Sequence, residues 1–319
     1  MFSPQKGKTA LTRSETVTAP DAGKTQFAAV VNRASGYVGE KSPAHVQAML
    51  ENAAHSRLCD LKFLDPDDIL EGLKDAFEGP CGGVIVLGGD GTARCAAEFA
   101  MKHDKPLIPL PGGTMNLLPR KLYGERGPAD ALRAALGGQR ALIDAGQADD
   151  RLFFLSAAFG FAPDMTRARE AFRGQTGLDA LPRVLSFARR ALADAFHMNV
   201  LFGVDGEEPG REAELLVVAL GGLSHLMELK VDEDVGRKFE CIASDVHDLG
   251  EAARLGFNAL TQRWREDPGV AIDCTEQVRV KLKEEDPYGV LDGEPMKLKC
   301  EFDVRYLKDA IPVLAPAEA

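Results

Sequence analysis

An acid stands among glycines at the end of an apolar run. Residues 84–92 read VIVLGGDGT, and apolar residues then recur at helical spacing from Ala93 to Met101. Glycines at a strand-to-helix turn allow positive φ and close approach of a ligand, and the start of a helix attracts anions. A carboxylate beside phosphate needs a hard cation such as Mg²⁺ between them. The first glycine loop, residues 88–92, is therefore predicted to bind a metal–nucleotide complex, with Asp90 as the metal ligand.

The alternative to a phosphate-binding loop at these residues is an ordinary Asp-Gly tight turn. Two further strand ends favour phosphate binding instead. The second glycine loop, residues 111–116, reads PGGTMN after the apolar run 107–110, and residues 30–36 read VVNRASG, which offers Asn32, Ser35 and Gly36. Because the carboxyl ends of parallel strands lie at one edge of a sheet, these segments are predicted to line one cleft.

Asp-Gly-Glu occurs twice, at 205–207 and at 292–294. An aspartate could take the proton of an attacking hydroxyl in a phosphoryl transfer. Asp-Gly between strands is, by default, a hairpin turn. The residues alone do not distinguish the two copies.

The first half of the chain alternates strands with helices. Strands are expected at 27–32, 82–89 and 107–110, and helices at 43–59 and 128–137, the latter begun by Pro128 and ended by glycine. This alternation predicts an α/β domain with a parallel sheet.

The second half is predicted to be β-rich. Val278, Val280 and Leu282 alternate with charged residues, and a second alternation runs from Met296 to Val304. Period-2 patterning indicates half-buried antiparallel strands. The boundary is expected near residues 138–150, with a flexible tail at 1–25, an ATP-binding α/β domain at 26–140 to which 305–319 returns, and an antiparallel, sandwich-like substrate domain at 141–304.

The segments VVNRASG, GGDGT, PLPGGTMNLLPRKLYG and the later VLDGEP, in this order, resemble the diacylglycerol kinase/sphingosine kinase-like lipid kinases. The resemblance implies a nucleotide-binding domain followed by a β-rich lipid domain. It selects Asp292 as the general base, assisted by Glu294, and leaves 205–207 as a plain turn. It also implies a set of residues that bind ATP and Mg²⁺: Asn32, Gly88, Gly89, Asp90, Gly91, Thr92, Thr114 and Asn116.

The implied activity is ATP- and Mg²⁺-dependent phosphorylation of a hydroxyl of a diacylglycerol, sphingoid base or ceramide. NAD kinases share GGDGT and are an alternative. So is a nucleotide-binding regulator without catalysis, because Arg94 and Cys95 stand where the family usually carries Asn-Glu. Arg94 is expected to be a solvated helix residue, with phosphate contact as the alternative. Phe153, Phe154, Phe159 and Phe161 could line an acyl pocket, although strand phenylalanines are usually core.

The composition of the chain limits which binding partners and which cellular compartment are expected. A net charge of −11 argues against a nucleic-acid partner. The six scattered cysteines suit neither a zinc site nor a disulfide scaffold, and free thiols fit a reducing cytoplasm. No spanning segment or signal peptide is expected. The basic amphipathic stretch 181–196 suggests peripheral contact with the inner face of a membrane, against the alternative of an ordinary surface helix. The oligomeric state is left open.

Overall fold

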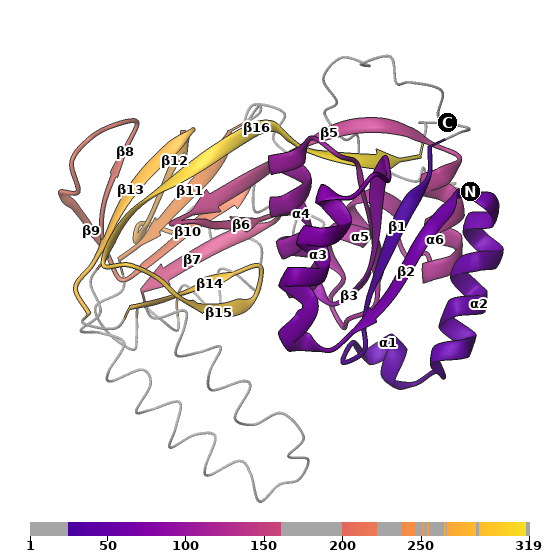
Figure 1. Ribbon diagram of the computed structural model, residues 1–319. Coiled ribbons are helices and arrows are strands. Elements are labelled where there is room, and N and C mark those ends of the chain that lie inside the picture. Colours follow the sequence, from indigo (N-terminus) through magenta and orange to yellow (C-terminus); the bar gives the residue numbers. More distant parts are fainter. Residues whose placement is uncertain are drawn as a thin grey trace, which may run out of the picture. The chain divides into compact units, whose positions relative to one another are not determined.

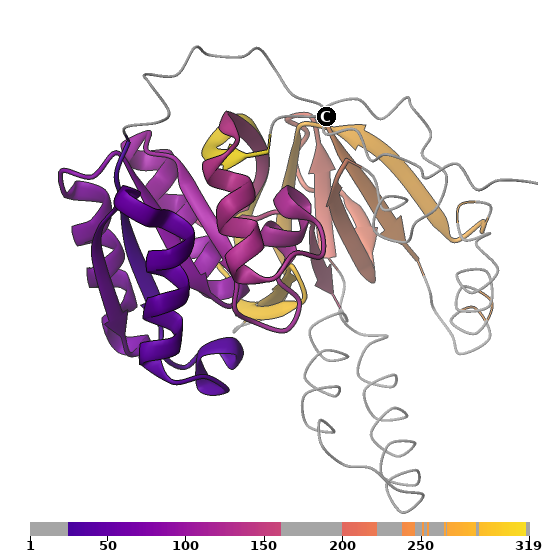
Figure 2. The same ribbon diagram turned by 90° about the vertical axis from the view of Figure 1, so that its right-hand side faces the viewer.

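The computed structural model describes residues 25–160, 200–221, 238–245, 251, 254, 265, 267–284 and 287–316 (Figures 1 and 2). The chain divides into two compact units. Unit 1 takes the chain up to Ile143 and again from Asp309, and unit 2 is Asp144–Lys308. The amphipathic stretch 181–196, Phe161 and the expected tail at 1–24 lie outside the described residues.

Unit 1 is an α/β unit. Its strands are β1 Phe27–Asn32, β2 Leu58–Leu64, β3 Gly83–Gly88 and β4 Leu107–Pro111. Its helices are α1 Gly36–Gly39, α2 Pro43–Ala54, α3 Ile69–Glu78, α4 Asp90–His103, α5 Leu117–Tyr123 and α6 Pro128–Leu136, with the 3₁₀ turns His55–Arg57 and Pro66–Asp68. The strands pair in parallel in the order β2-β1-β3-β4, which confirms the predicted sheet.

Helices cover both faces of this sheet (Figure 1). α3 packs against α4, and α2 packs against α6. The alanine stripe predicted for α4 is buried at Ala93, Ala96, Ala97 and Ala100, so it is the face that packs inward. Small side chains there let α4 lie close to β3, whose residues are buried throughout.

The predicted helix over 43–59 was wrong at its end. α2 stops at Ala54, and Leu58 begins β2, which the sequence reading missed together with α3. β2 is an edge strand in which two residues are exposed and none is fully buried, so its apolar signal is weak. Tertiary pairing with β1 decided its conformation, since every residue of β1 has a partner on β2.

Two strands belong in part to each unit. They are β5 Gln139–Ala148 and β16 Glu301–Ala315. The expected boundary at 138–150 thus falls on a strand instead of a loop, with the division after Ile143. In unit 1 the end of β16 lies beside β4, where Val313 pairs with Leu107 in parallel. Tyr123 Oη donates to the Leu314 carbonyl at 2.9 Å, and burial raises the pKa of this phenol.

Unit 2 is built of antiparallel strands. Those that belong to it entirely are β6 Arg151–Phe153, β7 Ser156–Gly160, β8 Val200–Val204, β9 Arg211–Ala213, β10 Leu215–Leu220, β11 Phe239–Ser244, β12 Val270–Thr275, β13 Gln277–Leu282, β14 Tyr288–Leu291 and β15 Glu294–Lys297. One sheet has the order β12-β11-β10-β7-β14-β15, and a second set pairs as β16-β13-β8-β9.

Apolar side chains from both sets of strands form one core in unit 2. Phe159 of the first sheet contacts Phe302 of the second edge to face, with ring centroids 5.3 Å apart. Val278 and Val280 are fully buried, as their alternation predicted. The fold class predicted from the sequence, a parallel α/β domain followed by a β-rich, sandwich-like domain, is confirmed. Phe153, Phe154 and Phe159 are buried, as expected for core residues.

The alternation from Met296 to Val304 does not form one strand. β15 ends at Lys297 and β16 begins at Glu301, so the pattern crosses a break in which Cys300 is exposed. The apolar residues of the two successive strands continue the same every-second-residue alternation across the break. Period-2 patterning therefore does not reveal it.

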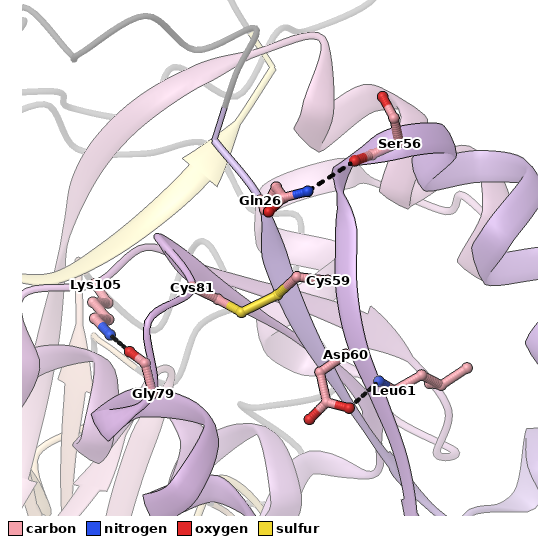
Figure 3. Close-up of a disulfide and its surroundings, with 8 residues drawn as sticks. All are labelled: Gln26, Ser56, Cys59, Asp60, Leu61, Gly79, Cys81 and Lys105. Atoms are coloured by element: carbon pink, nitrogen blue, oxygen red, sulfur yellow. Dashed lines mark hydrogen bonds between the residues drawn. A yellow bond between two sulfur atoms is a disulfide. The ribbon is translucent and has the colours of Figure 1, made fainter.

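Cys59 and Cys81 form a disulfide, which corrects the expectation that all cysteines are thiols (Figure 3). The bond joins β2 to the segment before β3, two parts that the missed strand β2 brings together. Cysteine usage therefore no longer supports a reducing compartment. Among the described residues, no helix is both long and apolar enough to cross a membrane.

Candidate phosphate-binding site and acidic turn

The two glycine loops of unit 1 pack backbone against backbone. A Cβ on Gly112 would lie 2.8 Å from the Gly88 carbonyl oxygen, and one on Gly113 would lie 2.8 Å from Gly89 Cα. Neither contact could be relieved by moving a side chain. None of these four glycines has a positive φ, so the loops do not use the positive φ that glycine allows. They need glycine for mutual approach.

The end of β1 is tied to the first glycine loop. Asn32 Nδ2 donates to Thr92 Oγ1 at 2.9 Å. The backbone N–H of Tyr37 donates to the Gly112 carbonyl at 3.0 Å, which links the same segment to the second loop. Three strand ends thus meet at one edge of the sheet, as predicted for Asn32, the first loop and the second loop.

Ser35 lies in this cluster. It is 6% exposed, and its Oγ has no hydrogen-bond partner within the described part of the chain. Its backbone N–H donates to the Asn32 carbonyl at 3.1 Å. A buried hydroxyl without a partner costs free energy, so this position suits a polar ligand.

Asp90 faces the second loop. Its Oδ2 accepts the Asn116 N–H at 2.9 Å, and its Oδ1 accepts the Leu117 N–H at 2.6 Å. Within the described ranges, no three His, Cys, Asp or Glu side chains gather in a way that could hold a metal ion. The predicted metal role of Asp90 stays a prediction, and these residues do not form a ready-made Mg²⁺ site.

Asn116 and Thr114 differ in surroundings. Asn116 has a φ of 52°, and its side chain closes the loop by accepting the Gly113 N–H at 2.7 Å and donating to the Gly113 carbonyl at 2.8 Å. Thr114 is exposed. Gly91 and Thr92 lie in the first turn of α4, with Thr92 8% exposed.

Arg94, also near the start of α4, is 8% exposed, so its expected solvated position was wrong. The Arg94 guanidinium at this helix end therefore contacts protein atoms instead of bulk water. Sequence reasoning placed it outside because arginine is mostly exposed in proteins.

The two Asp-Gly-Glu copies form similar turns with different contacts. Asp292 and Gly293 have φ of 52° and 84°, and Asp205 and Gly206 have 50° and 89°. Positive φ at both central residues is typical of tight hairpin turns. Asp205 Oδ1 accepts a hydrogen bond from the Thr275 hydroxyl at 2.5 Å, on a turn that is exposed.

Asp292 is 5% exposed and accepts three backbone N–H groups. The donors are Phe154 at 2.8 Å, Leu155 at 2.8 Å and Ser156 at 3.2 Å. The Asp292 N–H donates in turn to the Ser156 carbonyl at 2.9 Å. Backbone donors stabilise an ionised carboxylate. Glu294, the first residue of β15, is half-buried.

These features define a class: an α/β unit with paired glycine loops at its strand ends, joined in sequence to a β-sandwich unit with a buried acidic turn. Residues 26–148 match the diacylglycerol kinase catalytic domain. This match over part of the chain confirms the resemblance that the motifs predict.

Solved structures share the fold over nearly the whole chain. A candidate diacylglycerol kinase from Bacillus anthracis str. Sterne has 17% identity and a TM-score of 0.63, covering 93% of this chain and 98% of that one. A diacylglycerol kinase structure from the same organism has 14% identity and a TM-score of 0.59, covering 91% and 97%. At these identities the likeness shows the two-domain fold.

Proposed function

We propose that this protein is an ATP-dependent lipid kinase that phosphorylates a hydroxyl of a membrane lipid. The observation that carries the proposal is the pair of interlocked glycine loops within the diacylglycerol kinase catalytic domain, residues 26–148. Such loops at the carboxyl ends of parallel strands, one followed by the 14-residue helix α4, suit the phosphates of a nucleotide.

ATP suits this edge of unit 1 because three strand ends meet there and Ser35 keeps a buried hydroxyl without a partner in the described chain. Asn32, Thr92, Thr114 and the two loops would hold the nucleotide. ATP would supply the phosphoryl group that is transferred. The residues around Asp90 do not form a metal site by themselves, so a Mg²⁺ ion held there would take its other ligands from the nucleotide phosphates and water.

Asp292 is proposed to act on the lipid hydroxyl. The three N–H donors stabilise its ionised form, which is the form able to accept a hydrogen bond or a proton. The hydroxyl proton would pass to this carboxylate while the oxygen bonds to the γ-phosphorus and the bond to the ADP oxygen breaks. Glu294 is proposed to assist.

The substrate class follows from the family. Diacylglycerol is the first expectation, and sphingoid bases and ceramides are included because the family resemblance covers their kinases. NAD kinase remains the alternative with the same first loop. A regulator without catalysis is the second alternative, favoured by the buried Arg94 in the first loop's helix.

Radiolabelled ATP offered with lipid in mixed micelles tests the proposal. The panel contains diacylglycerol, sphingosine and ceramide, and a parallel reaction contains NAD. We expect label in a lipid product, its loss in Asp292→Asn, and its retention in the matched turn variant Asp205→Asn. Label on NAD alone would replace the proposal with NAD kinase, and ATP binding without any transfer would favour the regulator.

A further inference from the structure

The carboxylate of Asp90 caps a helix that begins 27 residues later in the chain. Helix N-termini leave backbone N–H groups without partners, and a side chain of the N-cap residue usually accepts one. The N-cap residue of α5 is Asn116, which makes no such bond, because its Oδ1 accepts the Gly113 N–H instead. Asp90 supplies the missing acceptor to Asn116 and Leu117 from the other loop.

The contact joins the two glycine loops at a second place. Gly112 and Gly113 already lie against Gly88 and Gly89, backbone to backbone. The Asp90 bonds, at 2.9 and 2.6 Å, fix the far end of the second loop relative to the first. Bonds from a charged acceptor to backbone donors are among the stronger ones in proteins. Both loops are thereby held in one arrangement before any ligand binds.

The contacts of Asp90 account for an acid among the glycines without a metal ion. Each of its oxygens accepts one backbone N–H, and the part of the chain that the structure describes has no cluster of three side chains suited to a metal ion. Mg²⁺ in nucleotide sites is commonly bound by one or two carboxylates together with phosphates and water, so experiment must separate the two roles.

We propose that Asp90 is a positioning residue that holds the second glycine loop, residues 111–116, against the first, and affects nucleotide binding through that loop instead of through a metal ion. The effect on nucleotide rests on the proposed function, whereas the loop contact does not. The two parts can therefore be tested separately.

Hydrogen exchange of the ligand-free, full-length protein tests the contact. The amides of Asn116 and Leu117 should exchange slowly in the native protein. In Asp90→Asn, where an amide NH₂ replaces one acceptor oxygen, they should exchange about tenfold faster or more. Asp75→Asn, the same change on the surface of α3, should leave them unchanged. Fast exchange of these amides in the native protein would overturn the proposal even if the variant failed to fold.

Kinetics with the lipid substrate test the consequence. Asp90→Asn should raise the KM for ATP, while the free Mg²⁺ concentration at half-maximal rate stays as in the native protein. Recovery of the variant by added Mg²⁺, with unchanged exchange at residues 116 and 117, would assign Asp90 to the metal and overturn the proposal. If the native protein transfers no phosphate, the kinase function fails and the exchange experiment still decides the contact.

Discussion

At the scale of single residues, Asp292 and Asp205 show how burial separates two copies of one motif. Both occupy turns of positive φ, but only Asp292 is buried and bound by three backbone N–H groups. Asp292→Asn should lower kcat by about 10²–10⁴-fold, the usual cost of losing an acid–base group, with little change in ATP binding. Steady-state kinetics and isothermal titration with ATP measure both quantities.

Asp205→Asn is the control, since it makes the same change in the same kind of turn and should leave kcat near the native value. Thermal melting must accompany the kinetics, because an asparagine NH₂ at 292 would face backbone donors. A native melting temperature with native kcat in Asp292→Asn would contradict the assignment.

Cys241 gives a second prediction at this scale. The pKa of its thiol is raised to about 12, first by burial and then by the charge of Asp273, with Arg211 opposing the shift. A raised pKa keeps the thiol protonated up to that pH, and the thiolate is the reactive form. At pH 8 a maleimide should label the exposed Cys274 and Cys300 and leave Cys241 unmodified until the protein unfolds. Peptide mapping checks this, and equal rates at all three would show that the strand opens.

At the scale of elements, the contact between the glycine loops predicts a steric cost. Gly112→Ala places a Cβ about 2.8 Å from the Gly88 backbone, which no rotamer change relieves. We expect a loss of about 1–3 kcal/mol in the free energy of unfolding, the usual cost of overpacking, together with weaker ATP binding. Urea denaturation measures the first. Gly39→Ala is the control, because a Cβ there meets nothing within 4 Å.

The Cys59–Cys81 bond joins β2 to the segment before β3 and closes a loop of 22 residues around α3 (Figure 3). A closed loop of this size stabilises by about 3 kcal/mol in the chain-entropy model. Cys59→Ser should therefore lower the urea midpoint, whereas Cys274→Ser, on an exposed thiol, should not. Alkylation in denaturant should modify four of the six cysteines before reduction and all six after it. Six labels without reductant would show that the bond is absent.

At the scale of the whole molecule, a chain of net charge −11 must reach a lipid at a bilayer surface if it is a lipid kinase. The candidate contact is the basic amphipathic stretch 181–196, outside the described residues, with an ordinary surface helix as the alternative. Flotation with vesicles should show binding that rises with anionic lipid and falls with salt, since charges are screened within about 10 Å at 0.1 M. Arg189→Glu with Arg190→Glu should weaken it. Binding that ignores both salt and these changes would place the contact elsewhere.

The sequence by itself determined the features that depend on neighbours along the chain. The apolar runs before Asn32, Gly88 and Pro111 sufficed to place three parallel strands, and the alanine spacing sufficed for α4. The glycine motifs indicated the family, and residues 26–148, which contain them, match its catalytic domain.

Only the tertiary structure decided features that depend on residues far apart. β2 is a strand because β1 pairs with it, and Cys59 meets Cys81 for the same reason. The backbone partners of Asp90 lie 26 and 27 residues away, and a local pattern cannot register a contact made by main-chain N–H groups, so the sequence did not indicate that this side chain joins the two loops. Burial of Arg94 likewise depends on what packs over α4. The free energy of packing across the whole unit decides whether this side chain is buried, and no local sequence pattern contains that information.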